Sequence, residues 1–189
     1  MKDFTPIINL LFNDPFLSEE VKQAFCSILH EFKVKKGATF LQEGAICNYI
    51  YIVDSGLVRQ YFYKGGIDIT EHFAWEIQGF TCLESYIEHT PSHLIVEALE
   101  DSVIYGIHKD ELNELTEKYR PIELMYRRIL EQSLLISQKR MYSMLFETAR
   151  ERYNHLMKAT PFLINRVPSM YIASYLGITP ETLSRVKGH

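Results

Sequence analysis

Glu181 and Arg185, near the end of the chain, have the side-chain types and the spacing needed to read DNA bases. An Arg guanidinium can bind the O6 and N7 atoms of guanine, and a Glu carboxylate can accept a hydrogen bond from the amino group of cytosine. Residues four apart lie on the same face of a helix, so both side chains can enter one major groove. The pair is therefore a candidate for base contacts in double-stranded DNA.

Two short helices are expected to position this pair, one on each side of Gly177. An apolar run with helical spacing, residues 172–176, stops at Gly177, which can adopt a left-handed conformation without steric cost. Thr179 can then cap a second helix, and Pro180 fits its first position because no N–H is needed there. This pattern predicts a helix-turn-helix, and an ordinary helical hairpin is the alternative.

The second helix is expected to bury one face and expose the other. Leu183 and Val186 are three residues apart and can pack inward with Ile178, which leaves the polar side chains on the opposite side. The residues predicted to contact DNA are Thr179, Pro180, Glu181, Thr182, Ser184, Arg185 and Lys187.

Charge is divided unevenly along the chain. Residues 147–189 hold six Lys or Arg and three Asp or Glu, a net charge of 6 − 3 = +3. The remaining residues hold 14 basic and 21 acidic side chains, a net charge of 14 − 21 = −7, which gives −4 for the whole chain. A basic C-terminal part is expected to face the DNA phosphates, while the acidic remainder stays away from the duplex.

The composition indicates a globular protein: 47% of the 189 residues are hydrophobic and 23% are charged. No run of eighteen apolar residues is present, and residues 1–6 lack an apolar signal core, so we expect a cytoplasmic protein with no membrane partner. The sequence shows no nucleophile–base pair, no metal triad and no glycine-rich phosphate loop, so no enzymatic activity is predicted.

Cys26, Cys47 and Cys82 are far apart in the sequence and form no Cys-x-x-Cys pair. We therefore predict buried thiols with a packing role and no metal site or cofactor. The alternative is a sensing thiol at one of the three positions, which would need an electropositive environment.

An all-β sandwich or barrel is predicted from Val34 to about His108. Residues 4–32 have helical spacing, with Ser18 as a helix cap, and from Val34 the period changes to two. Gly65-Gly66 between two strand-like runs predicts a hairpin. The predicted strands are residues 39–41, 49–53, 57–63, 67–73, 95–99 and 102–107.

A long helix is predicted to begin at Pro121, after a short one over residues 109–119. No Gly or Pro follows until Pro161, and two apolar stripes run along this stretch. One stripe is expected to pack on the β domain and the other on a second copy of the chain. The alternative is a core helix that breaks near Phe146.

The order of these parts resembles the Crp/Fnr family of bacterial transcription regulators. The matching residues are Gly37, Gly44, Ser55-Gly56 and Gly65 in the β domain, residues 97–102 before its last strand, and the motif over residues 172–185. The resemblance implies an α+β fold with three parts. Residues 1–120 form a cyclic-nucleotide-binding-like β-roll (jelly-roll) sensor domain, residues 121–146 a dimerisation helix, and residues 147–189 a winged-helix-like helix-turn-helix domain.

For the DNA-binding residues, the resemblance implies that Glu181 and Arg185 read bases, while Thr179 and Thr182 contact backbone phosphate. Pro180 stands where the family usually has an Arg, so the family's consensus half-site does not carry over. Double-stranded DNA and a second copy of the chain are the implied partners, with RNA polymerase as a further one.

The family members that bind cyclic AMP have a Gly-Glu pair and, about ten residues later, an Arg that pairs with the cyclic phosphate. Phe80-Thr81 and Pro91 stand at these positions, so cyclic AMP is not expected to bind. An apolar effector pocket is a separate hypothesis. Its candidate residues are Phe73, Trp75, Phe80, Cys82, Tyr86 and Ser92.

Two further branches of the family bind an iron–sulfur centre or a haem. An iron–sulfur centre needs four cysteine ligands, and this chain has three. A haem site would draw on His72, His89 and His93, but Pro91 argues against one helical face for the last two, so surface or loop positions are expected.

Two functions stay open at this point. The first is a homodimeric, sequence-specific DNA-binding regulator with a sensor roll. The alternative is a sensor or partner-binding module with a vestigial helix-turn-helix, which is favoured by Pro180 and by the short stretch after Arg185.

Overall fold

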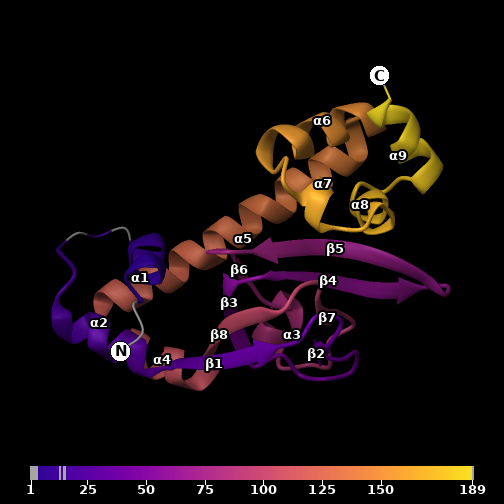
Figure 1. Ribbon diagram of the computed structural model, residues 1–189. Coiled ribbons are helices and arrows are strands. Elements are labelled where there is room, and N and C mark those ends of the chain that lie inside the picture. The colour runs from indigo at the N-terminus through magenta and orange to yellow at the C-terminus, as the bar shows by residue number, and fades with distance from the viewer. Residues whose placement is uncertain (1–3, 13, 15, 189) are drawn as a thin grey trace. The chain divides into compact units, whose positions relative to one another are not determined.

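The computed structural model describes residues 4–12, 14 and 16–188. These residues form two compact units: unit 1 comprises the chain up to Arg59 together with Phe73–Gln132, and unit 2 comprises Gln60–His72 and Ser133 onward (Figure 1). The elements of unit 1 are α1 (Thr5–Phe12), α2 (Glu19–Ser27), β1 (Leu29–Val34), β2 (Thr39–Leu41), β3 (Tyr49–Ser55), β6 (Gly79–Phe80), α3 (Leu83–Glu88), β7 (Ile95–Ala98), β8 (Ser102–His108) and α4 (Lys109–Lys118).

Three elements run through both units: β4 (Leu57–Lys64), β5 (Ile67–Trp75) and the long helix α5 (Arg120–Phe146). Unit 2 continues with α6 (Ala149–Ala159), α7 (Leu163–Arg166), α8 (Ser169–Tyr175) and α9 (Pro180–Lys187). The predicted β-roll, long helix and C-terminal helix pair are confirmed. From residue 109 to 188 the structure describes helices and turns but no strand. No helix of the described residues is long and apolar enough to cross a membrane.

The roll consists of two four-stranded sheets. One has the strand order β1-β8-β3-β6 and the other β2-β7-β4-β5. Strand β8 lies between β1 and β3 and is antiparallel to both, with Ile107 opposite Leu29 on one side and Ile50 on the other. Gly65 and Gly66, both with positive φ, form the turn between β4 and β5, as the sequence predicts.

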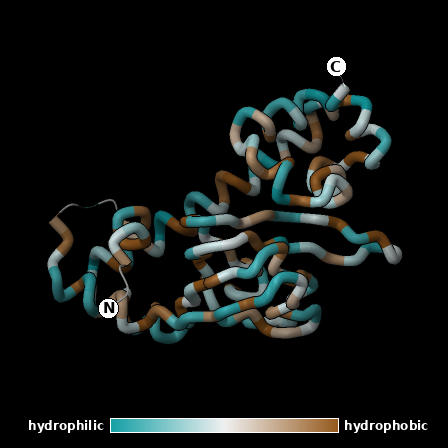
Figure 2. The backbone as a smooth tube through the Cα atoms, viewed as in Figure 1, coloured by the Kyte–Doolittle hydropathy of each residue, from teal (hydrophilic) through white to brown (hydrophobic). Residues whose placement is uncertain are grey.

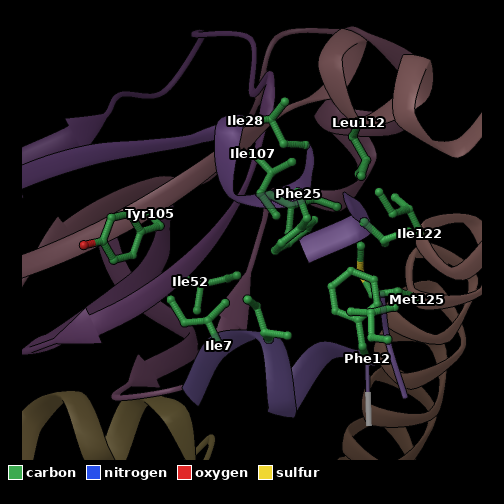
Figure 3. Packing of buried hydrophobic residues seen from close by; sticks show 14 of the residues in the cluster. Ile7, Phe12, Phe25, Ile28, Ile52, Tyr105, Ile107, Leu112, Ile122 and Met125 are labelled. Carbon is green, nitrogen blue, oxygen red and sulfur yellow. The ribbon is translucent and has the colours of Figure 1, made fainter. Parts of the chain in front are cut away.

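The first sheet separates two kinds of packing because alternate side chains of a strand point to opposite faces. Ile50 and Ile52 of β3 belong to a hydrophobic cluster with α1, α2, α4 and the first turns of α5 (Figure 3). Phe25 at its centre has no exposed surface, and its ring meets that of Phe12 edge to face at 5.0 Å. Burying each such side chain stabilises the fold by about 1.5–3 kcal/mol.

The other face of β3 carries aromatic rings. Tyr49 and Tyr51 stack at 5.7 Å between ring centroids, and Tyr51 stacks on Phe80 of β6 at 5.1 Å. Gly106 of β8 makes room for these rings, since a Cβ there would lie 2.7 Å from the Phe32 ring and 2.9 Å from the Tyr49 ring. A larger residue at position 106 would therefore disturb the aromatic packing.

The prediction that helix continues to Phe32 is wrong. Ser18 caps α2 as expected, but α2 ends at Ser27 and residues 29–34 form β1. The apolar spacing of Leu29 and Phe32 fits a helix locally. Pairing with β8 outweighs that preference, and Leu29 lies opposite Ile107 while Phe32 lies opposite Ile104.

Candidate nucleic-acid interface

The turn between α8 and α9 has the geometry that the sequence predicts for Gly177. Gly177 has φ +64°, its N–H donates to the Ser174 carbonyl oxygen at 3.0 Å, and the Ile178 N–H donates to the Ala173 carbonyl oxygen at 3.0 Å. This is a Schellman motif, which satisfies the last carbonyl groups of a helix. A Cβ at Gly177 would lie 3.1 Å from Met144 Sδ, so both the backbone and the packing favour glycine here.

Thr179 caps the N-terminus of α9, and Pro180 occupies the first turn, both as predicted. The Thr182 N–H donates to Thr179 Oγ1 at 3.2 Å. The pKa of Glu181 is held below its ordinary value by hydrogen bonding from Thr179, by its own backbone N–H, and by the charge of Arg185. Glu181 is therefore ionised at neutral pH, as an acceptor for a cytosine amino group must be.

The two faces of α9 differ as the sequence predicts. Leu183 is 1% exposed and Val186 is half-buried, whereas Glu181, Ser184 and Arg185 are exposed. Thr179, Pro180 and Lys187 are also exposed, and Thr182 is half-buried. All seven predicted DNA-contact residues thus lie on or next to one accessible helix.

Hydrogen bonds between side chains order two of the basic groups on α9. Arg185 donates through Nη2 to Thr182 Oγ1 at 3.3 Å, and Lys187 Nζ donates to Ser169 Oγ at 3.2 Å. The latter bond joins the last turn of α9 to the first residue of α8. Both partners are neutral hydroxyls, on the half-buried Thr182 and the exposed Ser169, and a phosphate or a base edge can replace them at small cost.

Arg152 of α6 supports the turn rather than the exposed face. Its Nε donates to the Leu176 carbonyl oxygen at 2.8 Å and its Nη1 donates to the Glu147 carbonyl oxygen at 2.5 Å. The guanidinium therefore satisfies carbonyl groups at the ends of two helices. The sequence counts Arg152 among the basic residues of the C-terminal part, but its charge alone does not reveal this structural role.

The β4–β5 hairpin contacts α8 within unit 2, which the sequence did not reveal. The Thr70 N–H donates to Ser174 Oγ at 2.8 Å, and Ser174 Oγ donates to the Asp68 carbonyl oxygen at 3.1 Å. Arg140 of α5 donates to the carbonyl oxygens of Thr70 at 3.4 Å and Tyr175 at 3.0 Å, and its guanidinium lies 4.3 Å from the centre of the Tyr175 ring. The hairpin thus holds Ser174, and Arg140 holds Tyr175, directly before the turn between α8 and α9.

The six candidate effector residues lie in different surroundings. Phe80 stacks on Tyr51, and Cys82 follows it at the start of α3. Tyr86 belongs instead to the hydrophobic cluster with α1 and α2, and the Ser92 hydroxyl hydrogen-bonds to Leu94. Phe73 and Trp75 lie on β5. The Tyr86 N–H donates to the Cys82 carbonyl oxygen at 2.8 Å, so these two residues lie on the first turn of α3, directly after Phe80 of β6.

The three histidines differ from one another. His89 is exposed at the C-terminal end of α3, and the His93 side chain is 56% exposed, as expected. His72 is not at the surface or in a loop: it is half-buried on β5. Among the described residues, no group of three or more His, Cys, Asp or Glu side chains is placed to hold a metal ion.

Comparison with known proteins agrees with this architecture. A family model for the cyclic nucleotide-binding domain matches residues 31–119. The fumarate and nitrate reduction regulatory protein of Escherichia coli (strain K12) is 26% identical over 170 residues, which cover 82% of this chain and 66% of that protein. This chain therefore spans just under two thirds of the length of that relative.

Solved structures share the fold. FixK2 from Bradyrhizobium japonicum superposes with a TM-score of 0.71 at 22% identity, covering 85% of this chain and 83% of that chain. A transcriptional regulator of the Crp/Fnr family from Eubacterium rectale superposes with a TM-score of 0.68 at 19% identity, covering 93% and 83%. Together with the matched domain and the order of roll, long helix and C-terminal helices, these findings show that the chain resembles transcriptional regulators of the Crp/Fnr family in sequence and in fold.

Proposed function

We propose that this chain regulates transcription by binding DNA sequence-specifically as a homodimer, with α9 entering the major groove. The observation that supports this most directly is the exposure of Glu181 and Arg185 on one face of α9, while Leu183 on the other face is buried. A capped and packed helix holds such side chains at a fixed spacing before DNA arrives. Base contacts then require little ordering of the protein.

A dimer is supported by the C-terminal half of α5. In the first half, Ile122 and Met125 are buried in the cluster of unit 1. The half that belongs to unit 2 carries large apolar side chains in the open: Leu134, Leu135, Ile136, Met141, Tyr142, Leu145 and Phe146 are between 45% and 70% exposed. Contiguous apolar surface of this kind is typical of an interface, and Leu134, Met141 and Leu145 have coiled-coil spacing.

The roll is proposed to function without cyclic AMP. Phe80, at the position of the family's Gly, is 6% exposed and stacked on Tyr51. Arg59 is a buried guanidinium of the roll, and its Nε donates to Glu97 Oε1 at 2.8 Å. This guanidinium therefore already pairs with a carboxylate of the roll. Calorimetric titration of cyclic AMP is expected to give no heat of binding, and micromolar affinity would contradict this proposal.

DNA binding can be tested by selecting ligands from random-sequence duplexes with the intact protein and then measuring mobility shifts. We expect enrichment of a twofold-symmetric site, because the two α9 helices of a dimer read related half-sites. Affinity should also fall with rising salt. Enrichment of no sequence above the starting pool would contradict sequence-specific recognition.

The dimer interface can be tested with the double variant Leu134→Glu/Met141→Glu, followed by sedimentation equilibrium. The matched control is Lys139→Glu, which makes the same change of −2 in net charge from an exposed position on the opposite side of α5 by helical periodicity. We expect the double variant to be monomeric and the control to stay dimeric. If wild type and both variants sediment alike, α5 does not form the interface.

A further inference from the structure

Two cysteines that lie far apart in the sequence meet inside the roll. Cys47 precedes β3 and Cys82 precedes α3, and their side chains are 1% and 2% exposed. Neither takes part in a disulfide. Both belong to unit 1, so their proximity follows from the fold of the roll itself.

Hydrogen bonds place the Cys47 sulfur next to the segment that carries Cys82. Cys47 Sγ lies 3.5 Å from Thr81 Oγ1, on the residue before Cys82. The Cys47 thiol also donates to the Tyr49 carbonyl oxygen at 3.4 Å, and the Thr81 hydroxyl donates to the same oxygen at 2.9 Å. Two buried thiols on neighbouring segments are a starting point for a disulfide, which forms without large backbone movement when the two side chains can reach each other.

The backbone holds the two segments together. The Cys47 N–H donates to Ser85 Oγ of α3 at 2.9 Å, and Ser85 Oγ donates to the Thr90 carbonyl oxygen at 2.5 Å. Two further bonds, from the Gly44 N–H to the Ser92 carbonyl oxygen at 2.7 Å and from the Ser92 N–H to the Ala45 carbonyl oxygen at 2.9 Å, fix the loop before Cys47. The cysteines therefore approach each other from braced segments.

The same surroundings favour the reactive form of Cys47. Hydrogen bonding with Cys82, and to a smaller extent with Thr81, outweighs burial and lowers the pKa of the Cys47 thiol below its usual range. The thiolate, not the thiol, is the nucleophile in sulfur chemistry. Cys26, which is half-buried, differs in this respect, because burial raises its pKa.

We propose that Cys47 and Cys82 form a redox-active dithiol in the sensor roll, which a hydroperoxide converts into an intramolecular disulfide. The Cys47 thiolate attacks one peroxide oxygen, the O–O bond breaks, and the departing oxygen takes a proton and leaves as an alcohol or water. Cys47 is then a sulfenic acid. Cys82 sulfur attacks the Cys47 sulfur, the S–S bond forms, the S–O bond breaks, and hydroxide leaves as water. Two electrons pass from the sulfurs to the peroxide.

Access to the pair is through the segment that contains Cys82. This segment follows β6, a strand of only two residues at the edge of its sheet. Short edge strands open locally at low cost compared with global unfolding. Oxidation is therefore expected to be slower than that of an exposed thiol, while the disulfide, once formed, links the loop before β3 to the start of α3.

The test is to treat the reduced, full-length protein with hydrogen peroxide at low protein concentration, alkylate it in denaturant and map its peptides by mass spectrometry. We expect a Cys47–Cys82 peptide pair that has lost two hydrogen atoms to become the main form of both cysteines and to disappear on reduction. Recovery of both cysteines as alkylated thiols, a link to Cys26 or a link between two chains would overturn the proposal.

Two variants sharpen the result. Cys26→Ser is the matched control and should form the disulfide with the yield of the wild type. In Cys82→Ser, the Cys47 sulfenic acid has no resolving thiol, so a sulfenic-acid reagent such as dimedone should label Cys47 much more than in the wild type. Equal labelling in both would show that Cys82 does not resolve it. If Cys82→Ser does not fold, as judged by circular dichroism, the peptide map of the wild type still decides the question.

Discussion

Arg59 in the roll and Arg185 on α9 carry the same side chain in opposite surroundings. Arg59 is 1% exposed and donates to Glu97 Oε1 at 2.8 Å, whereas Arg185 is exposed and donates to the hydroxyl of Thr182 at 3.3 Å. A buried guanidinium must keep its carboxylate, since an unpaired charge in the interior is strongly unfavourable. An exposed guanidinium is hydrated, so it can exchange its water for a ligand. The comparison shows that surroundings, not residue type, separate a structural arginine from a recognition residue.

Glu97→Ala should give the largest effect, because it removes the carboxylate that accepts a hydrogen bond from the buried Arg59 Nε. Removal of one partner of a buried ion pair typically costs about 3–5 kcal/mol of unfolding free energy. Urea unfolding followed by circular dichroism measures the change. The control Glu88→Ala removes an exposed carboxylate and should stay within about 0.5 kcal/mol of the wild type. Equal stability of the two variants would show that the Arg59–Glu97 pair does not stabilise the fold.

Arg185→Ala should leave the unfolding free energy within about 0.5 kcal/mol of the wild type, since the side chain is exposed. It should cost about 1–3 kcal/mol in binding to the selected DNA site and relax the preference at one base pair. Lys187→Ala is the comparison variant and should weaken all sequences similarly, reducing the salt slope by about one. If both changes act equally on specific and random DNA, Arg185 does not read a base.

Thr179→Ala removes the side-chain oxygen that accepts the Thr182 N–H at the start of α9. Loss of an N-cap typically costs about 1 kcal/mol of stability. Thr179→Ser keeps the oxygen and should restore most of the loss, as measured by urea unfolding. A wild-type stability for the alanine variant would show that packing of Leu183 alone fixes this helix.

Substitution of His72 should change the unfolding free energy least at neutral pH and more in acid. Burial and then the charge of Arg140 lower the pKa of His72 to about 4. In the unfolded chain a histidine titrates near about 6.5. Between these pH values the unfolded chain binds a proton that the folded chain does not, so stability falls as the pH drops from about 6.5 to 4.

His72→Gln should remove this part of the pH dependence, as measured by urea unfolding at several pH values. His93→Gln is the control, since the His93 side chain is 56% exposed, and it should leave the slope unchanged. An identical slope in all three proteins would mean that His72 titrates normally in the fold. Arg140, whose charge lowers the pKa of His72, is half-buried. Its exposure is therefore intermediate between that of the buried Arg59 and that of the exposed Arg185.

The sequence was sufficient for features that depend on neighbouring residues. Gly177, Thr179 and Pro180 define the turn and the cap of α9, because each acts on a backbone conformation within a few positions of itself. The strands of the roll were predicted for the same reason, because a side-chain period of two is also a local pattern. The division of α9 into a buried and an exposed face followed from the spacing of Leu183 and Val186.

Features that depend on distant pairing could not be predicted from local patterns. Leu29 and Phe32 have helical spacing, and only the partner strand β8 makes them a strand. The Arg59–Glu97 pair and the contact of Cys47 with Thr81, next to Cys82, join positions separated by several strands. Neither pair has a spacing that distinguishes it from unrelated polar or thiol residues, so the tertiary structure was needed to find them.

The hydroxyl of Ser174 has a consequence for how this protein tolerates sequence change. On the hairpin side, both of its hydrogen-bond partners are main-chain atoms, the Thr70 N–H and the Asp68 carbonyl oxygen. Any side chain at position 68 that preserves the strand therefore keeps the attachment, whereas a single Ser174→Ala substitution removes both bonds. This arrangement permits the side chains of the hairpin to change during evolution, while Ser174 itself must be kept.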